Sequence, residues 1–317
     1  MGLVLWAYIN LAREPNNIEV VPDELKNKDI QTSLINVDSG MTFEVDHCGD
    51  GEELVLCLHG FPEHSFSWRY QLPMLAQLGF TAWAPNLRGY GNTSRPNAVK
   101  DYALSELIED VAQLIVASQK KKVTLIGHDW GGFIAWEFAI VERLPIERLI
   151  VCNCPHPRSF IDAFGWSQLR KSWYMYFFQI PWLPEFSSGL QNALAIGRIF
   201  EKTNRNEAAF PPEIVDVYRR NASQPGALRA MINFYRAIRY GLWERERKWR
   251  NNHYGPIQVK TLLIWGEEDD FLEKALALNT HEYVTDLTIR FLPKTSHWVQ
   301  QERPEEVNQL IQEFVTE

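Results

Sequence analysis

The sequence predicts an α/β fold: a mostly parallel central sheet with helices on both faces and an inserted helical cap. Short apolar, β-branched runs recur along the 317 residues, and stretches with apolar residues at helical spacing lie between them. Such alternation is typical of a parallel sheet that is covered on both sides. The alternation is interrupted once, by a long aromatic-rich segment, which indicates an insertion.

The predicted strands are short runs rich in Val, Leu, Ile and Phe. They cover residues 54–58, 80–84, 123–126, 149–152, 261–265 and 287–291. Helices are predicted over residues 102–118, 133–142 and 304–314. The last of these begins with a proline and acidic residues, a common helix start.

The interruption begins at the Pro-His-Pro sequence of residues 155–157 and ends near residues 255–256. Residues 158–254 hold 19 of the chain's 40 aromatic residues, together with 15 Lys or Arg against 8 Asp or Glu. Their net charge is therefore +7, while the remainder carries −15 of the total of −8. We expect residues 1–157 and 255–317 to form the core, and residues 158–254 to form a helical cap over the strand ends, where open α/β sheets bind ligands.

The overall composition excludes some classes of function. A net charge of −8 argues against a nucleic-acid partner, because phosphate binding needs a basic surface. Four cysteines are too few for a disulfide scaffold and indicate a reducing compartment. Cys152, Cys154 and His156 lie close in sequence, but no second pair with ligand spacing accompanies them, so we expect no metal.

The N-terminal residues 1–12 are apolar, but they are fewer than the roughly 20 residues that a membrane-spanning helix needs. No basic segment precedes them, and Trp6 stands where a myristoylation signal has Ser or Thr. We expect an arm packed on the domain. A shallow interfacial anchor is the alternative.

The sequence Gly-His-Asp-Trp-Gly-Gly at residues 127–132 lies between a predicted strand and a predicted helix. Its glycines suit the sharp turn of a nucleophile elbow, in which a side chain is raised above the strand end. The raised residue is Asp129, where hydrolases of this pattern usually carry serine. Since a carboxylate is ionised at neutral pH without a neighbouring base, Asp129 favours attack on a carbon–oxygen or carbon–halogen bond.

Partners for this nucleophile follow other predicted strands. The backbone N–H groups of Phe61 and Trp130 are predicted to form an oxyanion hole. His297 follows the strand at residues 287–291, and the order nucleophile, acid, histidine predicts it to be the catalytic base. The acid is expected to be Asp269, with its neighbour Asp270 as the alternative.

Five short sequences together resemble the epoxide hydrolases of the α/β-hydrolase superfamily, from about residue 30 to the C-terminus. They are residues 59–63 (His-Gly-Phe-Pro-Glu) with 67–69 (Ser-Trp-Arg), 87–91 (Leu-Arg-Gly-Tyr-Gly), 127–132, 153–157 (Asn-Cys-Pro-His-Pro) and 296–298 (Ser-His-Trp). The resemblance implies an α/β-hydrolase fold and the conversion of epoxides to vicinal diols without a cofactor. Asn86 departs from the pattern, which has aspartate there.

The same resemblance implies two cap tyrosines that hold the epoxide oxygen, and the family pattern selects Tyr174 and Tyr235. A phenol can donate a hydrogen bond or a proton to the oxygen as it gains negative charge. Four further residues are expected to line the substrate pocket: Pro62, His128, Phe178 and Trp298.

Two other functions use the same residues. A haloalkane or haloacid dehalogenase shares the aspartate nucleophile, and Trp130 could bind the halide, although His-Gly-Phe-Pro differs from the His-Gly-Asn-Pro of many haloalkane dehalogenases. A non-catalytic ligand receptor on a hydrolase scaffold is the weaker alternative. We expect a lipophilic epoxide and water as the substrates and a cytoplasmic location. The basic, aromatic cap leaves membrane association open, though solvated arginines explain its charge more simply.

Overall fold

The computed structural model describes residues 20–241 and 254–317. The predicted N-terminal arm, residues 1–12, lies outside them. The eight strands of the described residues form one sheet in the order β1-β2-β4-β3-β5-β6-β7-β8. Strand β2 pairs antiparallel with both of its neighbours, β1 and β4. All other neighbouring strands pair parallel. The predicted α/β fold is therefore confirmed.

The strands are β1 (Gln31–Asn36), β2 (Thr42–Cys48), β3 (Glu53–Leu58), β4 (Thr81–Pro85), β5 (Lys122–His128), β6 (Arg148–Cys152), β7 (Lys260–Gly266) and β8 (Leu287–Leu292). The core helices are α2 (Gln71–Gln77), α3 (Leu104–Ser118), α4 (Trp130–Ile140), α12 (Ala275–Leu278), α13 (Val299–Glu302) and α14 (Pro304–Thr316). Between β6 and β7 lie α5 (Pro157–Asp162), α6 (Trp166–Lys171), α7 (Trp173–Phe177), α8 (Leu183–Thr203), α9 (Pro212–Ser223) and α10 (Ala227–Ala237).

All six predicted strands are present, but the sequence did not reveal β1 and β2. Every residue of β1 is exposed or partly exposed, so this edge strand lacks the continuous apolar run that identifies a buried strand. The three predicted helices are also present, as α3, α4 and α14, within a few residues of their predicted ends.

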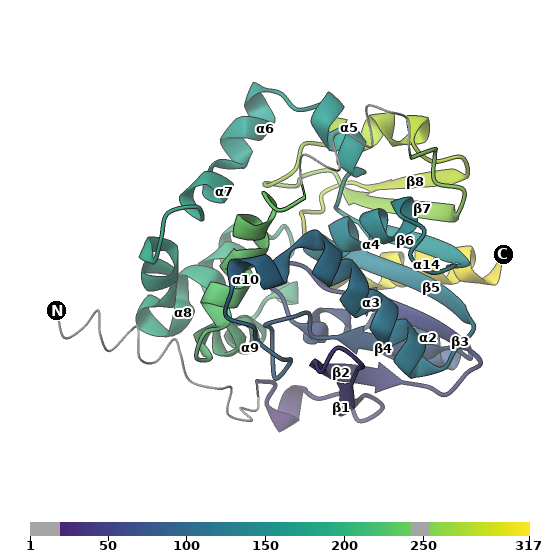
Figure 1. Cartoon of the computed structure of the whole chain (residues 1–317), viewed down its shortest axis with the longest axis horizontal. Helices are drawn as coiled ribbons and strands as arrows, with labels where there is room; N and C mark the ends of the chain where they lie inside the picture. The colour runs from purple at the N-terminus through teal and green to yellow at the C-terminus, as the bar shows by residue number, and fades with distance from the viewer. Residues whose placement is uncertain (1–19, 242–253) are drawn as a thin grey trace.

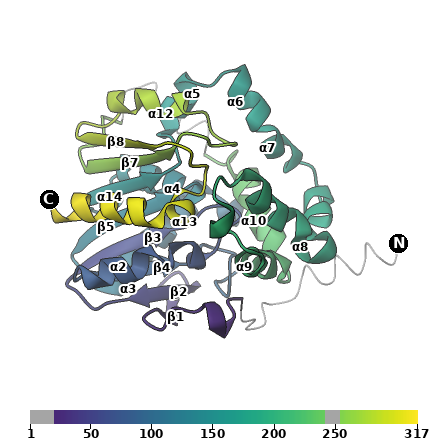
Figure 2. The ribbon, with the colours of Figure 1, turned by 180° about the vertical axis from the view of Figure 1, so that it is seen from behind.

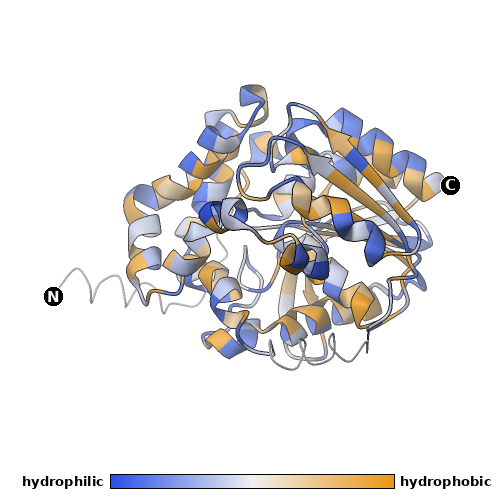
Figure 3. Ribbon diagram, turned by 90° about the horizontal axis from the view of Figure 1, so that it is seen from above, coloured by the Kyte–Doolittle hydropathy of each residue, from blue (hydrophilic) through white to orange (hydrophobic). Residues whose placement is uncertain are grey.

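Alternate residues of the central strands point to opposite faces of the sheet. In β3, Leu54, Leu56 and Leu58 belong to one apolar cluster, whereas Val55 and Cys57 belong to another. Helices α3 and α4 cover the first face, seen in Figure 1, while α2 and α14 cover the second, seen in Figure 2. The strands between these helices carry the most continuous hydrophobic colour in Figure 3.

Helices α5–α10, called the cap helices below, lie together beside the sheet (Figure 1). Residues 153–241 contain no strand, in agreement with the predicted helical character of the insertion. The division into a core and a cap domain at residues 157 and 254 stays a prediction. Across the two described ranges, no helix is long and apolar enough to cross a bilayer.

Close backbone contacts shape the turn between β5 and α4. Asp129 has φ +50°, a value that L-residues adopt at a cost, and it forms the N-cap of α4. A Cβ atom on Gly131 would lie 2.2 Å from the carbonyl oxygen of Leu58, and one on Gly127 would lie 2.3 Å from the carbonyl oxygen of Gly131. The glycines therefore let α4 begin directly against the end of β3.

Gly131→Ala tests this close packing. Because the clash is with backbone, the chain has to shift, and we expect a loss of about 1–3 kcal/mol in the free energy of unfolding, measured by urea denaturation. The control is Gly165→Ala, where a Cβ atom meets nothing within 4 Å, so the change should stay within about 0.5 kcal/mol. Equal losses in the two variants would contradict the packing argument.

Candidate active site

Asp129 is the point at which the loops after β3, β5 and β8 meet. Its Oδ1 atom accepts a hydrogen bond from the backbone N–H of Phe61 at 2.7 Å, and its Oδ2 atom lies 3.5 Å from Nε2 of His297. A Cβ atom on Gly60 would lie 2.5 Å from Cβ of Asp129, so only glycine allows the loop after β3 to approach this closely.

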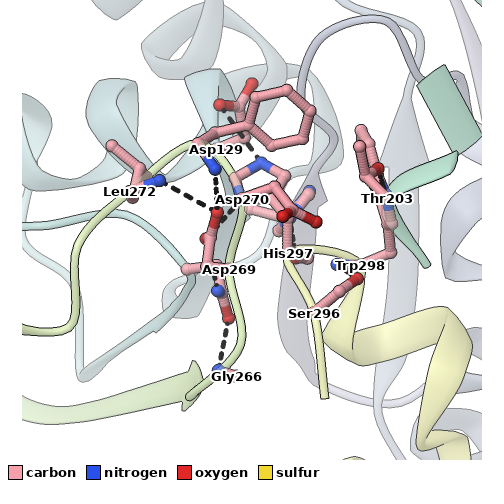
Figure 4. Close-up of polar contacts among 12 residues, drawn as sticks. Asp129, Thr203, Gly266, Asp269, Asp270, Leu272, Ser296, His297 and Trp298 are labelled. Carbon is pink, nitrogen blue, oxygen red and sulfur yellow. Dashed lines mark hydrogen bonds and ion pairs between the residues drawn. The ribbon is translucent and has the colours of Figure 1, made fainter. Parts of the chain in front are cut away.

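His297 links Asp129 to a second carboxylate, Asp269 (Figure 4). Nδ1 of His297 lies 2.7 Å from Oδ2 of Asp269. That carboxylate also accepts hydrogen bonds from the N–H groups of Phe271 and Leu272, at 2.7 and 2.9 Å, and from Nδ2 of Asn153 at 2.7 Å. A buried carboxylate with four donors stays ionised and fixes the orientation of the imidazole ring.

The electrostatics of the three groups favour charged forms. Burial alone would lower the pKa of His297, but the charges and hydrogen bonds of Asp269 and Asp129 outweigh it and raise the pKa to about 10. Burial likewise opposes ionisation of the two carboxyl groups, yet their contacts with His297 lower the pKa of each below its ordinary value. The resting site thus holds an imidazolium between two carboxylates.

The geometry separates Asp269 from the other carboxylates that follow β7. Arg205 pairs with Asp270 at 3.0 Å and with Glu268 at 3.0 Å, and Glu267 pairs with a lysine. Asp269 alone of these four contacts His297 in the described interactions. The sequence could not make this choice, because all four acids follow the same strand.

The structure places the two predicted oxyanion donors, the backbone N–H groups of Phe61 and Trp130, in different settings. Phe61 N–H already binds the Asp129 carboxylate. Trp130 is the first residue of α4, where helical geometry provides no partner for the N–H group. The assignment of both N–H groups to an oxyanion hole stays a prediction.

Tyr174 of α7 and Tyr235 of α10 come together above this carboxylate. Their ring centroids lie 5.8 Å apart, and their side chains hydrogen-bond to each other. The Trp130 indole also hydrogen-bonds to Tyr235 and, having only an N–H, acts as the donor. Burial, then the nearby Asp129 charge, raises the pKa of Tyr174, and burial with the neighbouring Tyr174 and Asp129 raises that of Tyr235. Both phenols are therefore protonated donors at neutral pH.

The carboxylate, the imidazole and both phenols line one cavity of about 620 Å³. Its wall also contains several residues of α6 to α8, together with Phe61, Pro62, Phe178, Asp270, Phe271 and Trp298. A second cavity of about 320 Å³ reaches the same carboxylate and phenols from the side of Trp130 and is almost entirely apolar, with Phe133, Phe160 and Met175 in its wall. Two cavities thus open from Asp129, the candidate nucleophile.

Pro62, Phe178 and Trp298 line the larger cavity as predicted, but His128 does not. His128 is fully buried, with Nδ1 2.7 Å from Oε2 of Glu63 and Nε2 2.8 Å from the carbonyl oxygen of His297. The prediction of His128 as a pocket residue is therefore corrected: its ring lies beneath the site, where both nitrogens meet oxygen acceptors.

Glu63 is a site residue to which the sequence analysis assigned no role, although it ends the His-Gly-Phe-Pro-Glu sequence. Its carboxylate is fully buried and accepts hydrogen bonds from Gly60 N–H at 2.8 Å, His128 at 2.7 Å, and the side-chain amides of Gln300 and Gln301 at 2.8 and 2.9 Å. Burial would raise the pKa of Glu63, but His128 outweighs it and lowers the pKa. Glu63 thereby joins the oxyanion loop, the end of β5 and the segment after His297.

Asn153 and Glu302 were also missed. Asn153 donates to Asp269 and accepts from Gly266 N–H at 2.8 Å. Glu302 accepts from both the N–H and the hydroxyl of Ser296, next to His297. The signal for Asn153 was its place directly after β6. Nothing in the sequence distinguishes Glu302 from the other acids near the C-terminus.

The departure at Asn86 has a local explanation. Its Nδ2 atom donates to Oε2 of Glu44 at 2.7 Å, and its Oδ1 atom accepts from Ser65 N–H at 2.8 Å. An aspartate here would place a second carboxylate against Glu44. The Asn86 amide therefore supplies a donor for Glu44 and an acceptor for Ser65, and its described hydrogen bonds do not involve Asp129.

Among residues 20–241 and 254–317, no group of three or more His, Cys, Asp or Glu side chains could hold a metal ion. All four cysteines are free and buried, and burial raises the pKa of the Cys152 and Cys154 thiols. The ring of His156 stacks on Tyr283, with centroids 4.9 Å apart. The Cys-x-Cys-Pro-His sequence thus packs into the fold.

Comparison with known proteins gives a consistent result. The model of the Alpha/beta hydrolase family matches residues 55–310. "Epoxide hydrolase 3" of Xenopus tropicalis is 37% identical over 288 residues, covering 88% of this chain and 76% of that protein. "Epoxide hydrolase 4" of Homo sapiens is 39% identical over 288 residues, covering 88% and 77%.

Solved structures show the same likeness. The crystal structure of an epoxide hydrolase from Vigna radiata aligns with a TM-score of 0.77 at 26% identity, covering 92% of this chain and 99% of that one. The Bacillus megaterium epoxide hydrolase in complex with an inhibitor aligns with a TM-score of 0.80 at 27% identity, covering 90% and 100%.

Asp129→Asn tests the charge arrangement around His297. Removing one carboxylate charge should lower the His297 pKa from about 10 towards its ordinary value, as measured by NMR titration of the ring protons. Asp270→Asn is the matched control, since Asp270 pairs with Arg205, and it should leave that pKa unchanged. An equal shift in both variants would contradict the assignment of contacts.

The same pKa predicts a pH dependence of stability. A histidine whose pKa rises on folding stabilises the folded state fully below its unfolded pKa, about 6.5, and this contribution is lost as pH rises through about 10. The free energy of unfolding of the wild type should therefore fall over this window. The fall should be smaller in Asp129→Asn, measured by urea denaturation at several pH values.

Proposed function

Because this chain belongs to the epoxide hydrolases of the α/β-hydrolase family, we propose that it converts an epoxide to a vicinal diol through a covalent ester on Asp129. One observation carries the proposal: the Asp129 carboxylate, the imidazole of His297 and the phenols of Tyr174 and Tyr235 line one cavity. A substrate in this cavity can therefore meet a nucleophile for its carbon, two proton donors for its oxygen and a base for the attacking water.

Ring opening is the first proposed step. A carboxylate oxygen of Asp129 attacks one oxirane carbon from the side opposite its oxygen, and the carbon–oxygen bond breaks with its electron pair going to oxygen. Tyr174 or Tyr235 transfers a proton to that oxygen, which gives a hydroxyalkyl ester and a phenolate. The Trp130 N–H donates to Tyr235 and would stabilise this phenolate.

Ester hydrolysis is the second step. Formation of the ester removes the Asp129 charge, which is one of the causes of the raised His297 pKa. His297 then gives up its proton, which restores the phenol, and becomes the neutral base. It takes a proton from water as the water oxygen attacks the ester carbonyl carbon. The N–H groups of Phe61 and Trp130 stabilise the resulting oxyanion. Its collapse breaks the bond between the carbonyl carbon and the alkyl oxygen, and the departing alkoxide takes the carboxyl proton, which releases the diol and restores the Asp129 carboxylate.

Asp269 is the proposed acid of the triad, in preference to Asp270. It contacts His297 at 2.7 Å and has its remaining lone pairs occupied by donors, including Asn153. This arrangement orients the ring and stabilises its charged form without moving a proton to Asp269.

The dehalogenase alternative is weakened by the contacts of Trp130. A halide would need the indole N–H, which instead binds Tyr235. The two raised-pKa phenols also suit an oxygen that needs a proton better than a halide that does not. The intact set of Asp129, His297 and Asp269 gives the non-catalytic receptor no support.

The cavity walls favour a lipophilic epoxide. Aromatic side chains dominate the larger cavity, and the smaller one is apolar. We include in the proposal the predicted cytoplasmic location, with peripheral membrane association as the alternative, and the absence of a nucleic-acid partner.

A single-turnover experiment in oxygen-18 water tests the ester. With enzyme in excess over substrate, the diol should carry unlabelled oxygen from Asp129, while the protein gains the label. Mass spectrometry of the diol and of the peptide containing Asp129 measures both. Direct labelling of the first diol would rule out the covalent route.

Phenylalanine substitutions test the tyrosines. Because either phenol can protonate the oxygen, Tyr174→Phe and Tyr235→Phe should each slow ester formation less than the double variant does, which we expect to lose about 10²–10⁴-fold. Rapid-quench measurement of ester formation gives these rates. Tyr176→Phe, on the same helix but exposed, is the control and should react at the wild-type rate.

A further inference from the structure

Several large aromatic side chains of the cap helices and their connections are exposed. Trp166 and Trp182 are 83% and 63% exposed, and Trp173, Tyr176 and Phe186 are exposed beside them in sequence. These five residues, called the aromatic rim below, come from α6, α7, the turn before α8 and the start of α8. In Figures 1 and 2 these helices lie on the side of the molecule opposite the C-terminus.

The stretch of chain that carries most of the rim has almost no charged side chains. Residues 172–197 contain one charged residue, Glu185. It is buried and pairs with Arg236, whose Nη2 atom donates to it at 3.1 Å. The same stretch also contains the exposed apolar residues Ile180 and Leu190. Soluble monomers rarely expose so many large apolar side chains within one short, almost uncharged stretch of chain unless these side chains contact a partner.

Basic residues border the rim. Arg170 lies one helical turn after Trp166 on α6, so both side chains share one side of the helix, and Arg170 is exposed. Arg198 is exposed further along α8. At larger scale, the described residues 158–241 hold 11 Lys or Arg against 6 Asp or Glu, a net charge of +5, while the other residues of the sequence carry −13. The resulting electrostatic asymmetry turns the cap towards an anionic surface.

The rim adjoins the larger cavity. Trp173 belongs to the rim and also lines that cavity, and Phe177, Arg170 and Ser187 line it from the same helices. A lipophilic molecule that reaches the rim is therefore already at the wall of the space that contains Asp129.

The chemistry of the rim fits a bilayer better than a second copy of this chain. Trp and Tyr side chains favour the membrane–water interface, where the ring is buried and the polar group remains wet. Arginine beside them is attracted to anionic headgroups. Two copies meeting through their rims would instead bring together two segments, residues 158–241 of each copy, that each carry a net charge of +5.

We propose that the aromatic rim docks this protein onto the surface of an anionic phospholipid bilayer, with the cap facing the lipid. Lipophilic epoxides dissolved in the bilayer then enter the cavity directly from the membrane. The docking proposal does not depend on the proposed function, whereas this route for the substrate rests on it.

Vesicle flotation of the full-length chain tests the docking. The vesicles are phosphatidylcholine alone, or phosphatidylcholine with phosphatidylserine. The wild type should bind the mixed vesicles more tightly, and added salt should weaken the binding. The variant Trp166→Gln/Tyr176→Gln/Trp182→Gln, whose substituted residues do not line the larger cavity, should lose about tenfold or more in partitioning.

The matched control is Leu34→Gln/Val116→Gln, which removes exposed apolar residues from β1 and α3 and should bind as the wild type does. All variants keep residues 1–12, so any contribution of that segment is constant. Turnover of a small water-soluble epoxide, measured without vesicles, should be equal in all three proteins. This assay reports on folding and on the proposed function separately from docking.

Three outcomes would overturn the proposal. The first is equal partitioning of the wild type and the rim variant. The second is an equal loss in the control variant. The third is concentration-dependent dimerisation that the rim substitutions abolish while vesicle binding is unchanged, because the occupant of the rim would then be a second copy of this chain.

Discussion

The buried contact of His297 with two carboxylates is the interaction on which the rest of the site depends. Three charged groups leave water together, which is favourable only if each finds a partner. Asp129 and Asp269 come from loops that follow β5 and β7, and His297 follows β8, so the parallel sheet has to bring three strand ends to one edge. The fold therefore offsets the cost of burying these charges, because it places each charged group next to a partner. The same contacts underlie the proposed roles of Asp129, His297 and Asp269.

Core and cap contribute different kinds of group to the site. The core supplies charges and backbone N–H groups around Asp129. The cap supplies the neutral phenols of Tyr174 and Tyr235, and it encloses them with aromatic rings. Trp130 connects the two parts, because its backbone belongs to the elbow while its indole donates to Tyr235. The acid that meets the substrate oxygen is thus positioned by the nucleophile's own helix.

The sequence predicted what local patterns can encode. Apolar runs identified six of the eight strands, and the glycines around Asp129 identified the elbow, because each signal lies within a few neighbouring residues. The half-exposed β1 offered no such run. The choice of Asp269 over Asp270 depends on which carboxylate the loop turns inward, and Glu63 depends on burial by segments more than 200 residues away, such as Gln300 and Gln301. His128 was misassigned because its neighbour Asp129 faces the cavity, whereas β5 buries His128 beneath it.

Glu63 has a consequence for how the enzyme loses function. Its one carboxylate is hydrogen-bonded to the oxyanion loop, to β5 and to the segment after His297. If any one of these segments moved away, the buried Glu63 carboxylate would lose a hydrogen-bond donor. Local opening of a single segment is therefore energetically costly. We therefore expect activity to be lost on heating together with the unfolding of the core, without an earlier transition confined to the active site.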